Sequence, residues 1–542
     1  MRTQSQMTSS SPQVVPPADE TAGLARAASL IAIGNVVSRL LGLARETVIA
    51  SLFGATGLVS AFRVAQIMPT MLYDLLVGGM VSSALVPVFS EQAERDRTAL
   101  WHVASLVLSL VAIGLGVVVL IIELAAPQIT FLMAPGFDEA GLAATTRLMR
   151  ITTPAVFFLS LSGIITGVLH ALKRFVLPAF TAALFNATIV VVALGGVFLF
   201  DWGIDILAVG LILGAFLQVM FQLPGLSDAR FYFVIDLRHP LLRRIGKLFW
   251  PIILGLVISQ LGIVLDRNFA SRTGEQSIAW MQFATTIIQF PLGLISAAIS
   301  LAILPTLSRL ASGPAVDSKL DEFMNTLATG LRLVLILIIP ATLALFILAE
   351  PIVALLFQRG NFTVFDTQQT TLALRFYLPG LTFAAIDQPL VFAFYARQNT
   401  LTPALVGLLG VGFYLAAALL PTLMRPMQMT DLVLANSIQL AGHALVMLWL
   451  MNRLGTLQRR GLGLTTLKAI AASAAMSLIL WSALSLLKDW FATEHLISRA
   501  TLVGGSTILG GAIYLFVLAL FRTEELSLLF ALLQRFLPKR PG

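Results

Sequence analysis

The chain has 542 residues, of which 58% are hydrophobic and only 11% are charged, and its mean hydropathy is +0.91. Soluble domains carry about 25% charged residues, so most of this chain is expected to be surrounded by lipid. The absence of cysteine excludes disulfides, thiol nucleophiles and thiolate metal sites. The net charge of +8 is not gathered in basic runs with interleaved aromatic residues, so no nucleic-acid partner is expected.

A polar, Ser- and Pro-containing stretch at 1–23 predicts a disordered N-terminal tail. Apolar segments follow, each long enough to cross a hydrocarbon core of roughly 30 Å. They lie near 24–53, 58–89, 101–133, 144–170, 176–200, 204–224, 241–270, 277–308, 325–357, 367–395, 402–424, 431–452, 464–487 and 498–521. The sequence therefore predicts an all-α polytopic membrane protein with about fourteen transmembrane helices.

The distribution of Lys and Arg between the connections predicts the orientation of these helices. If the N-terminus is cytoplasmic, the even-numbered connections and the C-terminal tail hold twenty Lys and Arg residues, whereas the odd-numbered connections hold seven. Cytoplasmic connections carry the excess of positive charge. We therefore expect both termini in the cytoplasm.

The first two segments resemble the seventh and eighth at a nearly constant offset. Ser38 aligns with Ser259, Arg45 aligns with Arg267, and the stretch 84–91 aligns with 302–309. A parallel repeat of six helices predicts two lobes with cargo bound between them, as in many transporters. The predicted units are the N-terminal lobe at 24–224 (helices 1–6), the C-terminal lobe at 225–455 (helices 7–12), and helices 13–14 with a cytoplasmic tail at 456–542.

Charged residues lie well inside the first apolar segment, where they are costly. A charge near the bilayer centre costs roughly 2.5–3.5 kcal/mol on insertion scales, so such residues usually face protein or a wet cavity. Arg39, Arg45 and Glu46 share one stripe of the predicted helix with Asn35 and Ser38. A basic stripe of this kind favours an anionic cargo.

The paired segments of both predicted lobes also have polar faces. The second segment carries Arg63 and Asp74, and the seventh carries Asp266 and Arg267. We expect these faces to surround a shared hydrophilic cavity. The alternative is that Arg39 with Glu46, Arg63 with Asp74, and Arg267 with Asp266 are ion pairs that only hold helices together.

One acid in the tenth segment, Asp387, has no evident partner nearby in the sequence. It is either a proton or cation site or part of a structural hydrogen bond. His170 and His443 are isolated and have no metal-ligand spacing to other residues, so we interpret both as structural.

No nucleotide-binding loop, dinucleotide turn or cluster of metal ligands is present in the sequence. We therefore expect a transporter rather than an enzyme. A membrane enzyme acting on lipid-linked substrates is the rival, but the short connections are poor in the acids and histidines that such enzymes expose.

Several motifs, in order along residues 27–455, resemble those of the MurJ (MviN) lipid II flippase family of the multidrug/oligosaccharidyl-lipid/polysaccharide exporter superfamily. The motifs are SRLLGLARETVIASLFGA at 38–55, SSALVPVFSE at 82–91, APGF at 134–137, GVLHALKRFVLPA at 167–179, QFPLGLISAAISLAILPTLSR at 289–309, LFQRGNFTVFDT at 356–367 and FYARQNTLTP at 394–403.

This resemblance implies a multi-pass protein of the bacterial cytoplasmic membrane. Its cargo would be lipid II, a polyprenyl-pyrophosphate-linked peptidoglycan precursor, moved from the inner to the outer leaflet for cell-wall synthesis. Arg39 and Arg45 match arginines that are implied to hold the pyrophosphate. Arginine suits this role because its planar fork binds phosphate bidentately.

The chain departs from the family pattern at two cavity arginines. Tyr73 and Asp74 stand where the family has Arg-Arg, and Thr285-Thr286 stand where it has Asp-Arg. We expect Arg63 and Arg267 to restore the charge, with Glu46 and Asp74 also lining the substrate site. Asp266 matches an acid that some members use for sodium.

Other cargoes and energy sources stay open at this stage. The alternatives are a flippase for another polyprenyl-linked glycan, a cation-coupled exporter of small amphiphiles that uses Asp74, Asp266 or Asp387, and a scaffold that transports nothing. We expect no bound cofactor, and coupling to the membrane potential, Na⁺ or H⁺. The expected partners are lipid II and membrane lipids, and the expected state is a monomer.

Overall fold

A computed structural model of the chain describes residues 18–75, 80–312, 317–457, 460–487, 495–523 and 525–526. Helices account for nearly all of these residues, and no strand occurs among them. The predicted tail at 1–23 lies largely outside the described residues, and the first helix already begins at Ala18, six residues before the predicted boundary.

The α-helices are α1 (Ala18–Phe53), α2 (Gly57–Ala65), α3 (Ile67–Tyr73), α4 (Val86–Arg95), α5 (Arg97–Met133), α6 (Glu139–Thr152), α7 (Ala155–Ala171), α8 (Val176–Phe200), α9 (Asp205–Gln222), α10 (Pro240–Ser271), α11 (Ser277–Pro291), α12 (Ala297–Ala311), α13 (Asp317–Ile347), α14 (Ala349–Leu356), α15 (Val364–Ala396), α16 (Leu401–Leu419), α17 (Met429–Leu454), α18 (Leu462–Leu487) and α19 (Leu496–Leu520). Short π-helices, η2 (Val81–Leu85) and η4 (Leu292–Ser296), and 3-10 turns, η3 (Leu223–Leu226) and η5 (Leu420–Leu423), connect some of them.

Polar side chains define where several of these helices begin. Asp138 accepts a hydrogen bond from the backbone N–H of Gly141 at the start of α6. At the start of α15, Thr363 and Asp366 form a reciprocal capping box. Such caps satisfy backbone N–H groups that have no partner within the helix.

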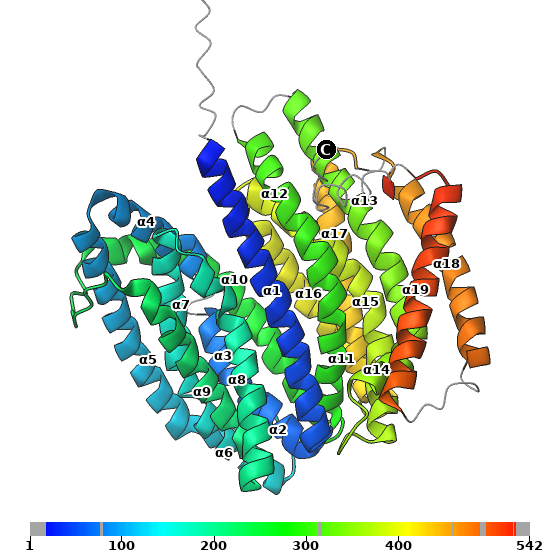
Figure 1. Cartoon of the computed structure of the whole chain (residues 1–542), viewed down its shortest axis with the longest axis horizontal. Helices are drawn as coiled ribbons and strands as arrows, with labels where there is room; N and C mark the ends of the chain where they lie inside the picture. Colours follow the sequence, from blue (N-terminus) through cyan, green and yellow to red (C-terminus); the bar gives the residue numbers. More distant parts are fainter. Residues whose placement is uncertain are drawn as a thin grey trace, which may run out of the picture.

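The helices form two lobes, each corresponding to six of the predicted spans, and a C-terminal pair (Figure 1). The N-terminal lobe comprises α1–α9, and the C-terminal lobe comprises α10–α17. The pair α18–α19 packs against α13 and α14 on the outer side of the C-terminal lobe. The lobe boundaries stay a prediction, although the break between α9 and α10 falls near the predicted one.

Ten helical segments within the described residues are long and apolar enough to cross a membrane. The four other predicted spans correspond to α1, the α2–α4 segment, α10 and α15. These four carry the eight charged residues singled out from the sequence. The structure is therefore consistent with fourteen spans without fixing that number.

The second span of each lobe is interrupted at related places. Helix α2 ends at Ala65, and Gln66 separates it from α3 before the π-turn η2. In the repeat, α11 ends at Pro291 and is followed by the π-turn η4. Proline removes a backbone donor and promotes such breaks. Both interruptions lie beside the junction of the lobes.

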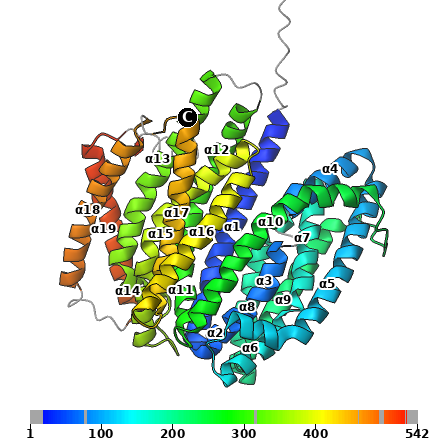
Figure 2. The same cartoon turned by 180° about the vertical axis from the view of Figure 1, so that it is seen from behind.

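Helix α1 lies between the two lobes in both views (Figures 1 and 2). It packs along α8 of its own lobe and contacts α11 of the other. The lobes meet at the end of the molecule where α2 and α11 begin, and they diverge toward the end where α4 and α12 finish (Figure 2).

The hydrophobic cores follow the same division. One large core joins both lobes and includes Ile49 and Phe62 of the first with Phe283 and Leu374 of the second. Toward the diverging end each lobe has a separate core, one around Phe89 and the other comprising residues near 323–331, 390–406 and 447–457. The lobes are therefore joined at one end by a shared apolar core.

Polar contacts reinforce this closed end, which we define as the α1–α2 junction, the end of α5, the α10–α11 junction and the loop 357–363. The side-chain amide of Asn361 donates to the Leu52 carbonyl over 2.6 Å, and its backbone N–H donates to the Ser51 carbonyl over 2.9 Å. The backbone N–H of Ala279 donates to Ser60 Oγ over 3.2 Å. These bonds cross directly between the lobes.

Candidate functional site

Arg39 links the first helix to the opposite lobe. Its Nη1 donates to the Gln289 carbonyl of α11 over 3.0 Å. The guanidinium also lies against Gly293 of η4, where an added Cβ would come within 2.1 Å of Arg39 Cζ. A guanidinium has five N–H donors, so one bond leaves most of its hydrogen-bonding capacity available at the junction.

Arg45, Glu46 and Arg63 form a compact ionic group on the N-terminal side of the junction. Arg45 Nη2 lies 2.8 Å from Glu46 Oε1, and Arg45 Nη1 donates to Asn186 Oδ1 of α8 over 3.0 Å. Arg63 Nη2 pairs with Glu46 Oε2. The side chains of Glu46 and Arg63 are both 1% exposed, whereas that of Arg45 is 22% exposed.

Burial separates the roles that these arginines can play. The Arg63 guanidinium lies between the rings of Phe62 and Phe283, with ring centroids 5.7 Å and 5.8 Å away. Phe283 belongs to α11, so Arg63 also touches the second lobe. In this conformation Arg63 is covered by protein, and Arg45 is the member of the group that a ligand can reach.

The C-terminal lobe contributes Arg267 and Asp266 from α10. Arg267 Nη2 donates to Gln282 Oε1 over 3.3 Å, while its Nε and Nη1 are buried without a hydrogen-bond partner among the described residues. Unsatisfied buried donors are costly. Arg267 therefore has unused capacity to bind an acceptor, and its side chain is 16% exposed.

The groups around Asp266 donate to it. The Tyr414 hydroxyl of α16 donates to Asp266 Oδ1 over 2.9 Å, and Arg267 Nε lies 4.0 Å from Asp266 Oδ2. A sodium ion requires oxygen ligands that accept rather than donate, and a neighbouring guanidinium repels a cation. The described residues also contain no group of three or more His, Asp or Glu able to hold a metal. This arrangement does not fit a cation.

The ion pairs differ from those suggested by sequence spacing. Glu46 pairs with Arg45 and Arg63 and not with Arg39, and Asp74 makes no ion pair among the described residues. Asp74 is the residue after α3, where the helix passes into residues outside the described part. Counted together, the four arginines and the three acids, Glu46, Asp74 and Asp266, leave one net positive charge.

Asp387 has a partner that the sequence spacing concealed. Its Oδ1 lies 2.8 Å from Nδ1 of His443, which is carried by α17. The two side chains are 18% and 15% exposed. This pair lies within the C-terminal lobe and, among the described residues, makes no hydrogen bond or ion pair with the arginines of the junction.

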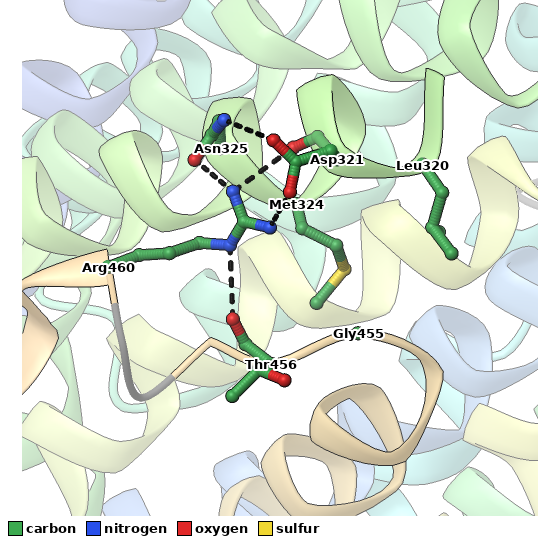
Figure 3. Close-up of a pocket in the computed structure, with 7 residues that line it drawn as sticks. All are labelled: Leu320, Asp321, Met324, Asn325, Gly455, Thr456 and Arg460. Atoms are coloured by element: carbon green, nitrogen blue, oxygen red, sulfur yellow. Dashed lines mark hydrogen bonds and ion pairs between the residues drawn. The ribbon is translucent and has the colours of Figure 1, made fainter. Parts of the chain in front are cut away.

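One described pocket, at the end of the molecule where α13 begins, is not a candidate for cargo binding. It has a volume of about 550 Å³ and is lined by the start of α13 and the segment after α17 (Figure 3). Its one cation, Arg460, already pairs with Asp321 at 2.5 Å and bonds to Asn325 and to the Thr456 carbonyl at 3.0 Å. We interpret it as a clamp that fixes the connection between α17 and α18.

Sequence reasoning missed Asn186, Tyr414 and the partner role of His443. All three lie far along the chain from the residues they contact. No local pattern could have identified them, although Asn186 is a polar residue within an apolar span. The assignment of substrate contacts to Arg39, Arg45, Glu46, Arg63, Asp74 and Arg267 stays a prediction.

Two lobes related by a parallel repeat, joined at one end, diverging at the other and with a cationic junction between them, define a polytopic membrane transporter.

Comparisons with known proteins narrow this class. A family model described as "Lipid II flippase MurJ" matches residues 49–501. The chain is 33% identical over 386 residues to the lipid II flippase MurJ of Burkholderia cenocepacia, covering 69% of this chain and 73% of the relative. It is 26% identical to the probable lipid II flippase MurJ of Rickettsia prowazekii, covering 91% and 96%. The chain belongs to the MurJ family.

Solved structures agree on the fold. A lipid II flippase MurJ in an inward closed conformation matches with a TM-score of 0.75 at 23% identity, covering 91% of this chain and 98% of that one. An inward-facing MATE-family transporter of the MOP superfamily matches with a TM-score of 0.64 at 14% identity, covering 78% and 96%. The predictions of family, fold class and transporter rather than enzyme are confirmed.

Proposed function

We propose that this chain carries lipid II from the inner to the outer leaflet of the bacterial cytoplasmic membrane by alternating access. The observation that carries this proposal is the group of arginines at the junction of the lobes in a member of the MurJ family. The names of the relatives support the cargo, because those proteins are described as lipid II flippases.

The pyrophosphate of the cargo would bind to Arg39, Arg45 and Arg267. Arg39 and Arg45 come from the N-terminal lobe and Arg267 from the C-terminal lobe, so one anionic group can bridge both. The buried donors of Arg267 that lack a hydrogen bond, Nε and Nη1, would gain acceptors on binding. Charge-assisted bonds from guanidinium to phosphate are short and strong. The net positive charge of the junction also offsets the negative charge of the head group.

Glu46 and Arg63 would position this site rather than touch the cargo. Glu46 holds Arg45 on one carboxylate oxygen and Arg63 on the other, so it fixes the rotamer of Arg45. Arg63 in turn anchors α2 between the two lobes. A preorganised side chain loses less conformational entropy on binding.

Orientation follows from the charge of the connections. The closed end carries the odd-numbered connections, which are poor in Lys and Arg, and we place it outside the cell. The start of α1 and the end of α19 both lie at the opposite end of the molecule, which we place in the cytoplasm (Figure 1). The described conformation is then closed outside, as required for loading from the inner leaflet.

The membrane potential would contribute to the cycle. Moving one elementary charge across the membrane is worth about 2.3 kcal/mol per 100 mV, and the junction carries a net charge that changes sides as the lobes rock. Both lobes and the complete junction come from one chain, which supports a monomer as the working unit.

Genetic rescue tests this function. Cells depleted of their own lipid II flippase should survive when this chain is expressed, and Arg39→Ala and Arg45→Ala should abolish survival at equal expression. Arg95→Ala is the matched control, because the Arg95 side chain is 71% exposed and, within the described part of the chain, its ion pair is with Glu91 at the surface. Rescue that is indifferent to both junction variants would contradict the proposal.

A direct assay separates lipid II from other polyprenyl-linked glycans. The outer-leaflet fraction of lipid II should rise with the parent chain and not with Arg39→Ala. Growth rescue without a change in that fraction would point to another cargo with the same pyrophosphate chemistry.

A further inference from the structure

A second ionisable site lies away from the arginines, between α15, α16 and α17 of the C-terminal lobe. Asp387 Oδ1 and His443 Nδ1 are 2.8 Å apart, and both groups are mostly but not fully covered by protein. Asp387 stands nine residues before the end of α15, or roughly 13 Å along the helix axis. The pair is therefore well within the membrane-spanning part.

The surroundings of the His443 ring determine whether a proton must lie between the ring and Asp387. Pro403, near the start of α16, places its backbone carbonyl within electrostatic reach of the His443 ring. Proline has no backbone N–H, so that carbonyl can only accept from the ring. When one ring nitrogen donates to the carbonyl, the neutral ring has only a lone pair to offer to Asp387.

A carboxylate and an imidazole lone pair at 2.8 Å would repel each other. The contact becomes a hydrogen bond only when one proton lies between the two atoms, either on Asp387 Oδ1 or on His443 Nδ1. At this distance, Asp387 and His443 therefore hold one exchangeable proton between them. Removing that proton leaves an unpaired negative charge inside the membrane, which is costly.

The remaining neighbours supply no positive charge that could take the place of this proton beside Asp387. From α16, Gly410 faces the ring, and a Cβ added there would lie 3.8 Å from His443 Cδ2. On α17, Gln439 lies beside the ring one turn away. Tyr395, at the end of α15, is the further titratable group that the described contacts place within electrostatic reach of Asp387. None of these carries a positive charge at neutral pH.

The repeat shows that the fold does not need an ionisable pair here. In the N-terminal lobe the corresponding helices, α7 and α9, are joined by Gln222 Nε2 donating to Ser162 Oγ over 2.6 Å and by Thr166 donating to Gln222 Oε1 over 2.9 Å. Neutral amide and hydroxyl groups therefore hold the same helix pair together in one lobe, whereas the other uses an acid and an imidazole.

We propose that Asp387 and His443 form a proton-binding site whose loading and release are coupled to movement of the lobes. In the loaded state, one proton shared by the pair holds α15 against α17. Release of the proton to solution leaves carboxylate and neutral imidazole, loosens that contact, and shifts the C-terminal lobe. The coupling of this site to transport rests on the proposed function, but proton binding itself can be tested without cargo.

The test uses the cysteine-free background of the chain. Cysteines at Ser60 and Ala279, whose contact crosses the closed end, would report closure through the rate of disulfide formation in the purified full-length protein. The pH is varied between about 5 and 8, the range in which histidine titrates. The rate at which free cysteine reacts is calibrated with an exposed single-cysteine variant, since thiolate content also changes with pH.

The expected result is a single-proton transition in the corrected cross-linking rate of the parent. The double variant Asp387→Asn/His443→Gln should remove the transition while folding normally, because two neutral side chains can hydrogen-bond to each other, as the amide and hydroxyl groups of α7 and α9 do in the N-terminal lobe. Thr382→Val on the same helix, which removes only a neutral bond to Thr342, should keep it. An unchanged transition in the folded double variant, or its absence in the parent, would overturn the proposal.

Failure of this site and failure of lipid II transport give different results. A pH transition without rescue of depleted cells would preserve the proton site and reject the cargo. Rescue by a chain whose closure does not depend on pH would support the cargo and reject the proton site.

Discussion

The guanidinium of Arg39 occupies the space that a side chain at Gly293 would need. An added Cβ at Gly293 would lie 2.1 Å from Arg39 Cζ and 2.2 Å from each terminal nitrogen. Gly293 follows Pro291 in the π-turn of the second lobe, whereas Arg39 comes from the first helix of the chain. The absent side chain therefore permits an arginine of one lobe to lie on the backbone of the other.

Gly293→Ala should displace Arg39 and weaken cargo binding without removing any charge. Loss of a charge-assisted hydrogen bond costs about 1.5–3 kcal/mol, which corresponds to roughly tenfold or more in affinity. We expect rescue of flippase-depleted cells to fall toward that of Arg39→Ala. Gly407→Ala on α16 is the control, because a Cβ there meets nothing within 4 Å. Normal rescue by Gly293→Ala would show that the position of Arg39 is not critical.

The Glu46–Arg63 pair should be more important for stability than for cargo binding. Removing one member of a buried ion pair costs about 3–5 kcal/mol because it leaves an uncompensated charge. Glu46→Ala should therefore lower the thermal unfolding temperature of the purified protein strongly. The double variant Glu46→Leu/Arg63→Met removes both charges and should recover much of that loss. Equal unfolding temperatures for the single and double variants would contradict this coupling.

The sequence predicted the helices and the repeat because their signals are local or periodic. Apolar length determines the spans, and the alignment of Arg45 with Arg267 places both on the helices that flank the junction. The polar stripe that contains Arg39 faces the other lobe as expected, since α1 is continuous through that region.

The partners of the charged residues could not be predicted because they depend on helix breaks and on distant helices. A helical wheel places Arg63 and Asp74 on one face only if the helix continues between them. Gln66 interrupts it, so the register assumed from spacing is lost. His443 and Asp387 are 56 residues apart and meet only because α15 packs against α17.

The loop between the lobes should be insensitive to mild acid. Asp228 pairs with Arg174 and Arg97, both at 2.7 Å, and the hydrogen bond from Arg174 lowers the pKa of the Asp228 carboxyl below its ordinary value. A lowered pKa contributes stability above the ordinary range of aspartate and loses it as the pH falls through the shifted value. Tyr232 of this loop donates its backbone N–H to Ser105 of α5.

Hydrogen exchange at Tyr232, corrected for the intrinsic rate, should therefore stay slow from neutral pH to about pH 5 and speed up only below about pH 4. Asp228→Asn at neutral pH should reproduce the faster exchange. Exchange that accelerates between pH 7 and 5 in the parent would mean that another group controls the loop.

Glycine at the closed end should control how firmly the lobes are joined. Gly136, after α5, lies so close to α10 that an added Cβ would be 2.4 Å from the Ser271 carbonyl oxygen. Its backbone N–H also donates to Ser271 Oγ over 3.1 Å. Because the obstacle is backbone, Gly136→Ala can be accommodated only if α5 and α10 move apart.

Overpacking of this kind costs roughly 1–3 kcal/mol, which shifts a two-state equilibrium by about 5- to 150-fold. Gly136→Ala should therefore open the closed end and slow disulfide formation between cysteines at Ser60 and Ala279 by a factor in that range. Gly114→Ala within α5 should not, because a Cβ there meets nothing within 4 Å. Equal cross-linking rates in both variants would mean that the contact at Gly136 does not hold the lobes together, and that the shared apolar core and the Asn361 bonds close this end without it.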